Sequence, residues 1–170
     1  MTTVVLGQEP VIEAWLADHR AKGLDKRDEV WEGVLHVAPI EHGRNGAVAM
    51  ELVSLLRALA RGAGLRAGGS FNLGEPSNFR VPDLGWHRGS PDALYFDTAA
   101  LVVEVHSPRD ESHRKFDFYA RHGVEEFWIV DPVEHSVRMW SLLDGAYEEQ
   151  TASALLGLSV VDVVAGVDWP

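Results

Sequence analysis

A short aliphatic run with one acid near its centre constrains this 170-residue chain more than any other feature. Residues 101–106 read Leu-Val-Val-Glu-Val-His and are followed by Ser-Pro. A β-branched run of this length that ends at a proline is typical of a strand in the middle of a sheet. A carboxylate on such a strand is costly unless its charge is compensated, and a metal ion is the usual compensation. The run therefore predicts a buried strand that carries a functional carboxylate, Glu104.

A second carboxylate follows a second predicted strand. Residues 79–81, Phe-Arg-Val, have the composition of a strand and lead through a proline to Asp83. Two carboxylates on neighbouring strands supply the hard oxygen ligands that a magnesium site needs. Asp92 also follows a proline, but the Gly-Ser pair before that proline indicates a turn, so Asp83 is favoured. Asp83 could instead be a turn carboxylate that bonds its own backbone.

The other residues of the Glu104 strand leave alternatives open. Side chains alternate along a strand, so Glu104 and His106 are expected on the same face. His106 could bind a metal, shuttle a proton, or be a polar residue hydrogen-bonded at the strand end. The preference of Mg²⁺ for oxygen disfavours the ligand role, whereas Mn²⁺ would favour it. Glu104 itself could form a structural ion pair with an arginine such as Arg80.

The composition favours one globular domain over residues 1–170. Apolar residues make up 46% of the chain, and its length is sufficient for a core. The chain has no cysteine, which excludes disulfides and cysteine-ligated zinc. Residues 1–7 do not resemble a signal peptide, and no run approaches the ~20 apolar residues of a membrane helix. A cytoplasmic protein without membrane contact is expected.

The charge distribution leaves room for a nucleic-acid partner. The net charge of −11 disfavours such a partner at first. Residues 126–170, however, hold eight acids and one base, a charge of −7, whereas residues 44–121 are balanced with ten bases and nine acids. Arginines of the chain could form a DNA-binding face, although each could equally be a solvated surface residue. They are Arg57, Arg61, Arg66, Arg80, Arg88, Arg109 and Arg114.

The element order predicts a mixed sheet with helices on both faces. Helices are expected over residues 10–23, 42–60, 112–122 (capped by Ser112) and 159–164. Strands are expected over residues 28–31, 34–37, 65–73, 79–83, 101–106, 127–130, 137–142 and 146–149, with little regular structure over 84–98. A strand–helix–strand unit at 101–130, inside an otherwise antiparallel set, indicates an α/β (α+β) fold with an N-terminal hairpin.

These residues together resemble the PD-(D/E)xK nuclease superfamily, and within it the Uma-type restriction endonucleases. Residues 80–83 resemble the first catalytic motif and residues 101–108 the second. Four further segments match in order over residues 28–150. They are the hairpin glutamate of residues 29–33, His42 at the start of the long helix, Lys115 with Tyr119, and the tail at 123–132.

One position departs from the superfamily pattern. The third motif residue of the superfamily is a lysine two positions after the glutamate, where this chain has His106. In the Uma-type branch that lysine is commonly absent, and Lys115 on the following helix is the natural substitute. Lys115 could instead be a surface lysine that pairs with Glu111. His106, His42 and Glu29 are expected near the site without binding the metal.

The resemblance implies a restriction-endonuclease-like fold and metal-dependent hydrolysis of DNA, most simply double-stranded DNA. Asp83, Glu104 and the backbone carbonyl of Val105 would hold Mg²⁺ or Mn²⁺, and Lys115 would assist catalysis. Symmetric cutting of a duplex needs two such sites, so a homodimer is expected. The alternatives are a catalytically inactive binding or assembly protein of the same fold, and a hydrolase or transferase for another phosphate-bearing substrate. The sequence does not separate DNA from RNA.

Overall fold

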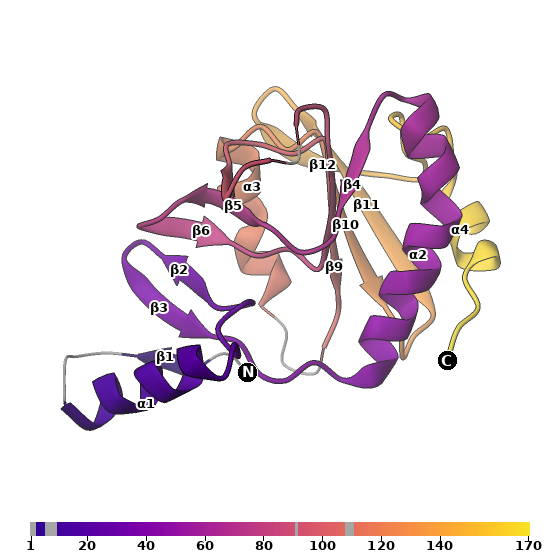
Figure 1. The fold of residues 1–170 in the computed structure, drawn as a ribbon. Coiled ribbons are helices and arrows are strands. Elements are labelled where there is room, and N and C mark those ends of the chain that lie inside the picture. Colours follow the sequence, from indigo (N-terminus) through magenta and orange to yellow (C-terminus); the bar gives the residue numbers. More distant parts are fainter. Residues whose placement is uncertain (1–2, 6–9, 91, 108–110) are drawn as a thin grey trace.

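Two six-stranded sheets form the frame of the protein in a computed structural model that describes residues 3–5, 10–90, 92–107 and 111–170 (Figure 1). The strands are β1 Thr3–Val5, β2 Glu29–Trp31, β3 Val34–Val37, β4 Arg66–Gly68, β5 Asn72–Glu75, β6 Asn78–Arg80, β7 Leu84–His87, β8 Tyr95–Phe96, β9 Leu101–Val105, β10 Glu126–Asp131, β11 Ser136–Leu143 and β12 Ala146–Gln150. The helices are α1 Pro10–Ala21, α2 Gly43–Gly62, α3 Phe116–Arg121 and α4 Val160–Gly166, with the 3₁₀ turn η1 Ser112–Lys115 directly before α3.

Both sheets are mixed, which confirms the predicted α+β class. One sheet has the order β1-β3-β2-β6-β5-β8 and the other β12-β11-β10-β9-β7-β4. The parallel pair β9–β10 is the predicted strand–helix–strand unit. The N-terminal hairpin β2–β3 is also present, and its turn residues Glu32 and Gly33 both have positive φ, as a tight two-residue turn requires. The sequence predicted one sheet, whereas the strands divide between two.

The sheet that contains β9 is covered by helices on both faces. Helix α2 packs Val48 and Leu52 onto one face, where they share a core with Val103 and Val105 of β9. Helix α3 covers the other face, where Tyr119 shares a second core with residues such as Val102. Because side chains alternate along a strand, Glu104 points to the side of α3, as Val102 does.

The expectation that residues 84–98 lack regular structure is wrong. They contain β8 and the fully buried β7, which pairs with β9 at the centre of its sheet. Gly85 made this segment resemble a turn in the sequence. In the structure the glycine lets the ring of Phe71 pack against the strand, because a Cβ atom there would lie 2.2 Å from Cε1 of Phe71. Asp83 therefore lies immediately before β7, and the predicted strand over residues 79–83 ends at Arg80.

The helix expected from Ser112 to about His122 is divided into two parts. Residues Ser112–Lys115 form the 3₁₀ turn η1, and α3 continues from Phe116 to Arg121. Glu111, rather than Ser112, precedes the turn, so the predicted capping position was one residue too late. This turn carries Lys115 inward, where its side chain is buried. Within the described part of the chain, no helix combines the length and the apolar composition needed to cross a membrane.

Candidate active site

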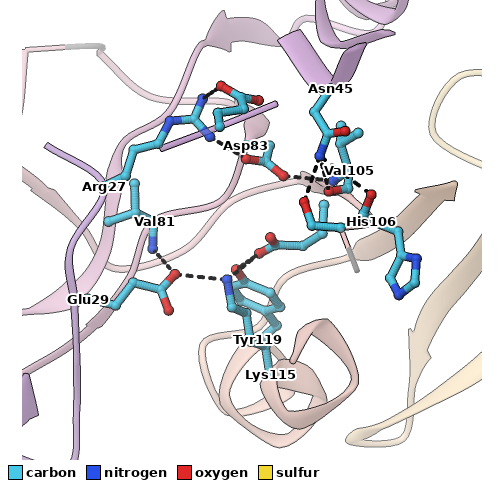
Figure 2. Close-up of polar contacts among 12 residues, drawn as sticks. Arg27, Glu29, Asn45, Val81, Asp83, Val105, His106, Lys115 and Tyr119 are labelled. Atoms are coloured by element: carbon cyan, nitrogen blue, oxygen red, sulfur yellow. Dashed lines mark hydrogen bonds and ion pairs between the residues drawn. The ribbon is translucent and has the colours of Figure 1, made fainter. Parts of the chain in front are cut away.

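Asp83 and Glu104 lie side by side where β7 begins and β9 ends. The two strands are antiparallel, and Leu84 is the partner of Val103, so the register brings the preceding Asp83 beside Glu104. The Oδ2 atom of Asp83 accepts a hydrogen bond of 2.7 Å from the backbone N–H of Val105 (Figure 2). The carboxylate of Asp83 is thus fixed against the strand that carries Glu104.

The Glu104 carboxylate is buried and receives two donors through a single oxygen. Its Oε1 atom lies 2.9 Å from Nζ of Lys115 and accepts a 2.6 Å hydrogen bond from the hydroxyl of Tyr119. Both donors come from the η1–α3 segment that follows β9. Neither of them is Arg80, whose guanidinium instead packs over the rings of Trp31 and Phe118. The arginine ion pair considered for Glu104 is therefore not the one that forms.

Lys115 bridges two carboxylates from distant parts of the chain. Its Nζ atom lies 2.8 Å from Oε1 of Glu29 and 2.9 Å from Oε1 of Glu104. Glu29 is itself fixed, because it accepts hydrogen bonds from the backbone N–H of Val81 at 2.8 Å and from Nε1 of Trp31 at 2.6 Å. Figure 2 shows Lys115 entering the cluster from η1 opposite Glu29. Lys115 is thus a buried, anchored cation beside Glu104 and not a surface lysine paired with Glu111.

Burial changes the proton affinities within this cluster. It raises the pKa of the Glu104 carboxyl, and the neighbouring carboxylates of Asp83 and Glu29 raise it further against the opposing charge of Lys115. Burial alone would lower the pKa of Lys115, but the carboxylates of Glu104 and Glu29 outweigh it and raise the pKa. Burial and the Glu104 carboxylate also raise the pKa of Tyr119, which therefore remains a proton donor at neutral pH.

Asp83 carries a cation of its own. The Nη1 atom of Arg27 lies 2.5 Å from Oδ1 of Asp83, and its Nη2 atom lies 3.2 Å from Oε2 of Glu41. Arg27 belongs to the segment between α1 and β2, 56 residues away from Asp83 in the sequence. Each of the two central acids, Asp83 and Glu104, is therefore paired with one positive charge in this structure.

The donor atoms around this cluster fit a hard divalent cation. One pocket is lined by Asp83, Glu104 and Val105, together with Lys115 and Arg27. Across the described ranges, no group of three or more His, Asp or Glu side chains is arranged to hold a metal ion. A metal here would rest on two carboxylates and the carbonyl of Val105, an all-oxygen set of the kind that Mg²⁺ and Mn²⁺ take. The two cations that now face Asp83 and Glu104 supply the positive charge that such an ion would bring.

Asn45 supports the strand end from the first turn of α2. Its Nδ2 atom donates to Oγ of Ser107 at 2.7 Å and lies 3.4 Å from the carbonyl oxygens of Val105 and His106. Asn45 is buried, as are Val48 and Ala49 on the following turn of α2. It thereby ties α2 to the carbonyl that is predicted to face the metal.

Two of the predicted neighbouring residues lie outside this cluster. The Nδ1 atom of His106 lies 3.0 Å from Oδ2 of Asp131, and Figure 2 shows its ring pointing away from Asp83 and Lys115. His42 is the N-cap of α2, where Nδ1 accepts a 3.3 Å hydrogen bond from the N–H of Arg44. Glu29, in contrast, is in direct contact with Lys115.

The structure also separates the two candidate aspartates. Asp92 is exposed, and its backbone N–H donates to Oγ of Ser90. It does not line the pocket that holds Asp83 and Glu104. Of the two aspartates that follow a proline, Asp83 is therefore the one beside Glu104.

The sequence assigned no site role to three residues of the cluster, namely Arg27, Asn45 and Tyr119. Tyr119 matches the family pattern together with Lys115, and its place in a helix that follows the β9 strand was the available signal. Asn45 had a weaker signal, a small polar residue on the apolar face of the helical pattern that begins at His42. Arg27 had none, because its partner is distant in the sequence.

Comparisons with known proteins show the family and the fold of this chain. Residues 15–169 match the model of the Uma2 family, which is described as "Putative restriction endonuclease". The crystal structure of a protein described as "a putative nuclease belonging to DUF820" from Anabaena variabilis is similar in fold, with a TM-score of 0.65 and 18% sequence identity over 82% of this chain and 90% of that one. The search of curated proteins found no match. Since the family model covers almost the whole chain, this protein is a member of the Uma2 family.

Proposed function

We propose that this protein is a metal-dependent nuclease that hydrolyses phosphodiester bonds in DNA. The observation that carries the proposal is the convergence of Asp83, Glu104 and the Val105 backbone on one pocket, with Lys115 in contact with Glu104. The names of the family and of the similar structure, both of which refer to nucleases, support the same reaction class.

Asp83, Glu104 and the carbonyl of Val105 would hold Mg²⁺ or Mn²⁺. When bound, such an ion supplies a nucleophile at neutral pH and stabilises the charge that develops on the phosphate. Tyr119 and the N–H of Val105 hold the two carboxylates in place by donating to one oxygen of each. Asn45 holds the strand end that presents the Val105 carbonyl.

Lys115 would act on the substrate as a fixed positive charge. Its contact with Glu29 keeps the ammonium group in the pocket independently of Glu104. From this position Lys115 can orient the attacking water or neutralise charge on the phosphate in the transition state. Glu29 is then a positioning residue that acts through Lys115.

Cleavage assays test the proposal directly. Purified protein is incubated with plasmid DNA and either Mg²⁺, Mn²⁺ or a chelator, beside the variants Asp83→Asn and Glu104→Gln. Asp92→Asn is a matched control, because it changes the other aspartate that follows a proline, which is exposed and does not line the pocket. We expect cutting by the wild type and by Asp92→Asn with metal, and none with chelator or with the pocket variants. No cutting by the wild type with either metal would overturn the proposal and favour the inactive binding protein.

Calorimetry tests the metal site without relying on activity. We expect Mg²⁺ or Mn²⁺ to bind the wild type and to bind Glu104→Ala far more weakly, because that variant loses one of two carboxylate ligands. Equal binding by both proteins would reject the assignment of Glu104 as a ligand. A parallel assay with single-stranded RNA decides whether DNA is the preferred substrate.

The assembly follows from the chemistry of a duplex. One pocket of this kind cuts one strand, so symmetric cutting of both strands needs two copies related by a twofold axis. We therefore propose a homodimer that acts in the cytoplasm on double-stranded DNA. Sedimentation of the protein with and without a duplex tests the dimer, and a monomer in both conditions would contradict it.

A further inference from the structure

The arginines of this protein divide into paired and unpaired groups. Of the eleven that the structure describes, six form ion pairs with carboxylates: Arg27, Arg80, Arg88, Arg114, Arg121 and Arg138. Three of the other five, Arg57, Arg61 and Arg66, line a single surface pocket. Arg80 is buried and cannot belong to the predicted DNA-binding face, and Arg109 lies outside the described residues.

This pocket, the arginine pocket, lies between the end of α2 and strands β4 and β7. Arg57 and Arg61 stand four residues apart on α2 and share one face, and Arg66 begins β4. The remaining lining residues are Val53, Ala60, Gly64, Leu65 and Trp86. No acid occurs among these described lining residues, so the pocket concentrates three positive charges in a chain of net charge −11.

Helix electrostatics do not account for this cluster. A cation in the last turn of α2 favours the negative end of the helix dipole, which explains Arg61 alone. Arg57 lies a turn earlier and repels Arg61, and Arg66 belongs to a different element. The three side chains are exposed and have no paired acid among the residues that the structure describes, so their charge is available to an anion from solution.

A buried donor in the pocket wall provides a second indication of a ligand. Trp86 is 1% exposed and lines the pocket, and its Nε1–H has no hydrogen-bond acceptor in the structure. Buried donors are normally satisfied, whereas the wall of this pocket holds one unpaired donor beside three arginines without paired acids in the described part of the chain. An acceptor with several oxygens and a negative charge, such as a phosphate group, suits the three arginines.

The spacing between the arginine pocket and the active site can be estimated along β7 and along α2. Asp83 precedes β7, and Arg66 pairs with His87 at the other end of that strand. At about 3.3 Å per residue, the backbone of His87 lies about 13 Å from that of Asp83. Along α2, Asn45 and Arg57 are separated by 12 residues, or about 18 Å. Successive base pairs of a duplex rise about 3.4 Å, so both estimates correspond to roughly 4–5 base pairs.

We infer that the arginine pocket binds backbone phosphates of the DNA duplex a few base pairs from the bond that is cut. The inference rests on the proposed function and extends it, because the active-site pocket is rich in acids and repels phosphates. The arginine pocket would supply the affinity that the acidic chain otherwise lacks. Contacts of this kind position a duplex without reading its sequence.

Binding measurements in the presence of a chelator test the inference without cleavage. Fluorescence anisotropy with a duplex of about 20 base pairs, at several salt concentrations, compares the wild type with the triple variant Arg57→Gln/Arg61→Gln/Arg66→Gln. The triple variant Arg88→Gln/Arg121→Gln/Arg138→Gln is the matched control, because it removes the same charge from exposed arginines that are paired with acids.

We expect the pocket variant to bind more than tenfold more weakly and to lower the slope of log K against log salt by about 2 to 3, and the control to change little. Equal binding by the wild type and the pocket variant, or an equal loss in the control, would overturn the inference. A pocket that binds inorganic phosphate but no duplex would also overturn the inference and would indicate a small phosphate ligand instead.

Cleavage kinetics separate this inference from the proposed function. The pocket variant should show a raised KM with little change in kcat, since the catalytic cluster is untouched. A wild type that binds duplex through these arginines but cuts nothing would reject the nuclease and retain the arginine pocket. A pocket variant that binds and cuts as the wild type does would retain the nuclease and reject the arginine pocket.

Discussion

The guanidinium of Arg27 lies 2.5 Å from the carboxylate of Asp83, although the two residues are 56 positions apart in the sequence. Asp83 is one of two carboxylates proposed to hold a divalent cation, and Arg27 lines the same pocket. A guanidinium and a metal ion repel each other at this range, so the ion pair opposes metal binding. Arg27 must give up Oδ1 of Asp83 when a metal takes it.

The variant Arg27→Gln is therefore expected to bind Mn²⁺ more tightly than the wild type. The gain should be roughly tenfold or more, because a full positive charge within a few ångströms of the ion is removed. Calorimetry measures it. Arg138→Gln is the control, since it removes the same charge from an exposed pair with Glu149. An unchanged dissociation constant for Arg27→Gln would show that the ion pair does not compete with the metal.

Local pattern was sufficient to predict the strand of Glu104 and the hairpins of the fold. The run Leu101–Val105 carries its own signal, because five consecutive buried residues need an apolar, β-branched sequence. The hairpin at Asp144-Gly145 is also local, since both residues take positive φ and that pair of residue types adopts it readily.

The environment of Asp83 could not be predicted in the same way. Strand β7 was missed because Gly85 resembles a turn residue, and only the ring of Phe71 explains why a glycine is needed there. The Arg27 pair and the Glu29–Lys115 bridge join segments 56 and 86 residues apart, and neither leaves a periodic signal. Such contacts depend on how the two sheets pack, which composition and periodicity do not specify.

His106 is expected to be dispensable for metal binding. Its imidazole contacts Asp131 and points away from the pocket, so His106→Leu should keep most metal-dependent cleavage and bind metal as the wild type does. Kinetics and calorimetry on the purified variant measure both quantities. A loss as deep as that of Glu104→Ala would mean that the histidine takes part in the reaction after all.

We expect the ionised carboxylate of Asp131 to contribute stability that is lost at low pH. Burial opposes ionisation of Asp131, but the backbone N–H groups of Glu134 and Val133, together with His106, outweigh it and lower its pKa. A lowered folded-state pKa contributes stability that is present above the unfolded pKa of about 3.9 and is lost as the pH falls through the lower folded value. The contribution should be about 1 kcal/mol or less, because the group is partly solvated.

Denaturant unfolding of the wild type and of Asp131→Asn at several pH values checks this contribution. The difference in unfolding free energy should be largest near neutral pH and should disappear below the folded pKa of Asp131. Asp92→Asn, a change in an exposed aspartate, is the control. A difference that is the same at every pH would mean that the carboxylate charge does not contribute.

Replacing Lys115 by Met should slow cleavage roughly 10²-fold or more, the range seen when an electrostatic stabiliser of a transition state is removed. The same change should also destabilise the fold, because it leaves the buried carboxylates of Glu29 and Glu104 without their shared cation. Removing one partner of a buried ion pair costs about 3–5 kcal/mol. The slower rate alone therefore cannot distinguish a catalytic lysine from a structural one.

The double variant Glu29→Gln/Lys115→Met makes that distinction. It removes one buried acid together with the buried base, so it should recover much of the stability lost in Lys115→Met while cutting no faster. A double-mutant cycle compares the wild type, both single variants and the double variant. Its two readouts are the single-turnover rate and the free energy of denaturant unfolding. If the rate returned together with the stability, Lys115 would serve only to neutralise Glu29 and Glu104. A rate that stays low in a protein of restored stability would show that the ammonium group itself acts on the substrate.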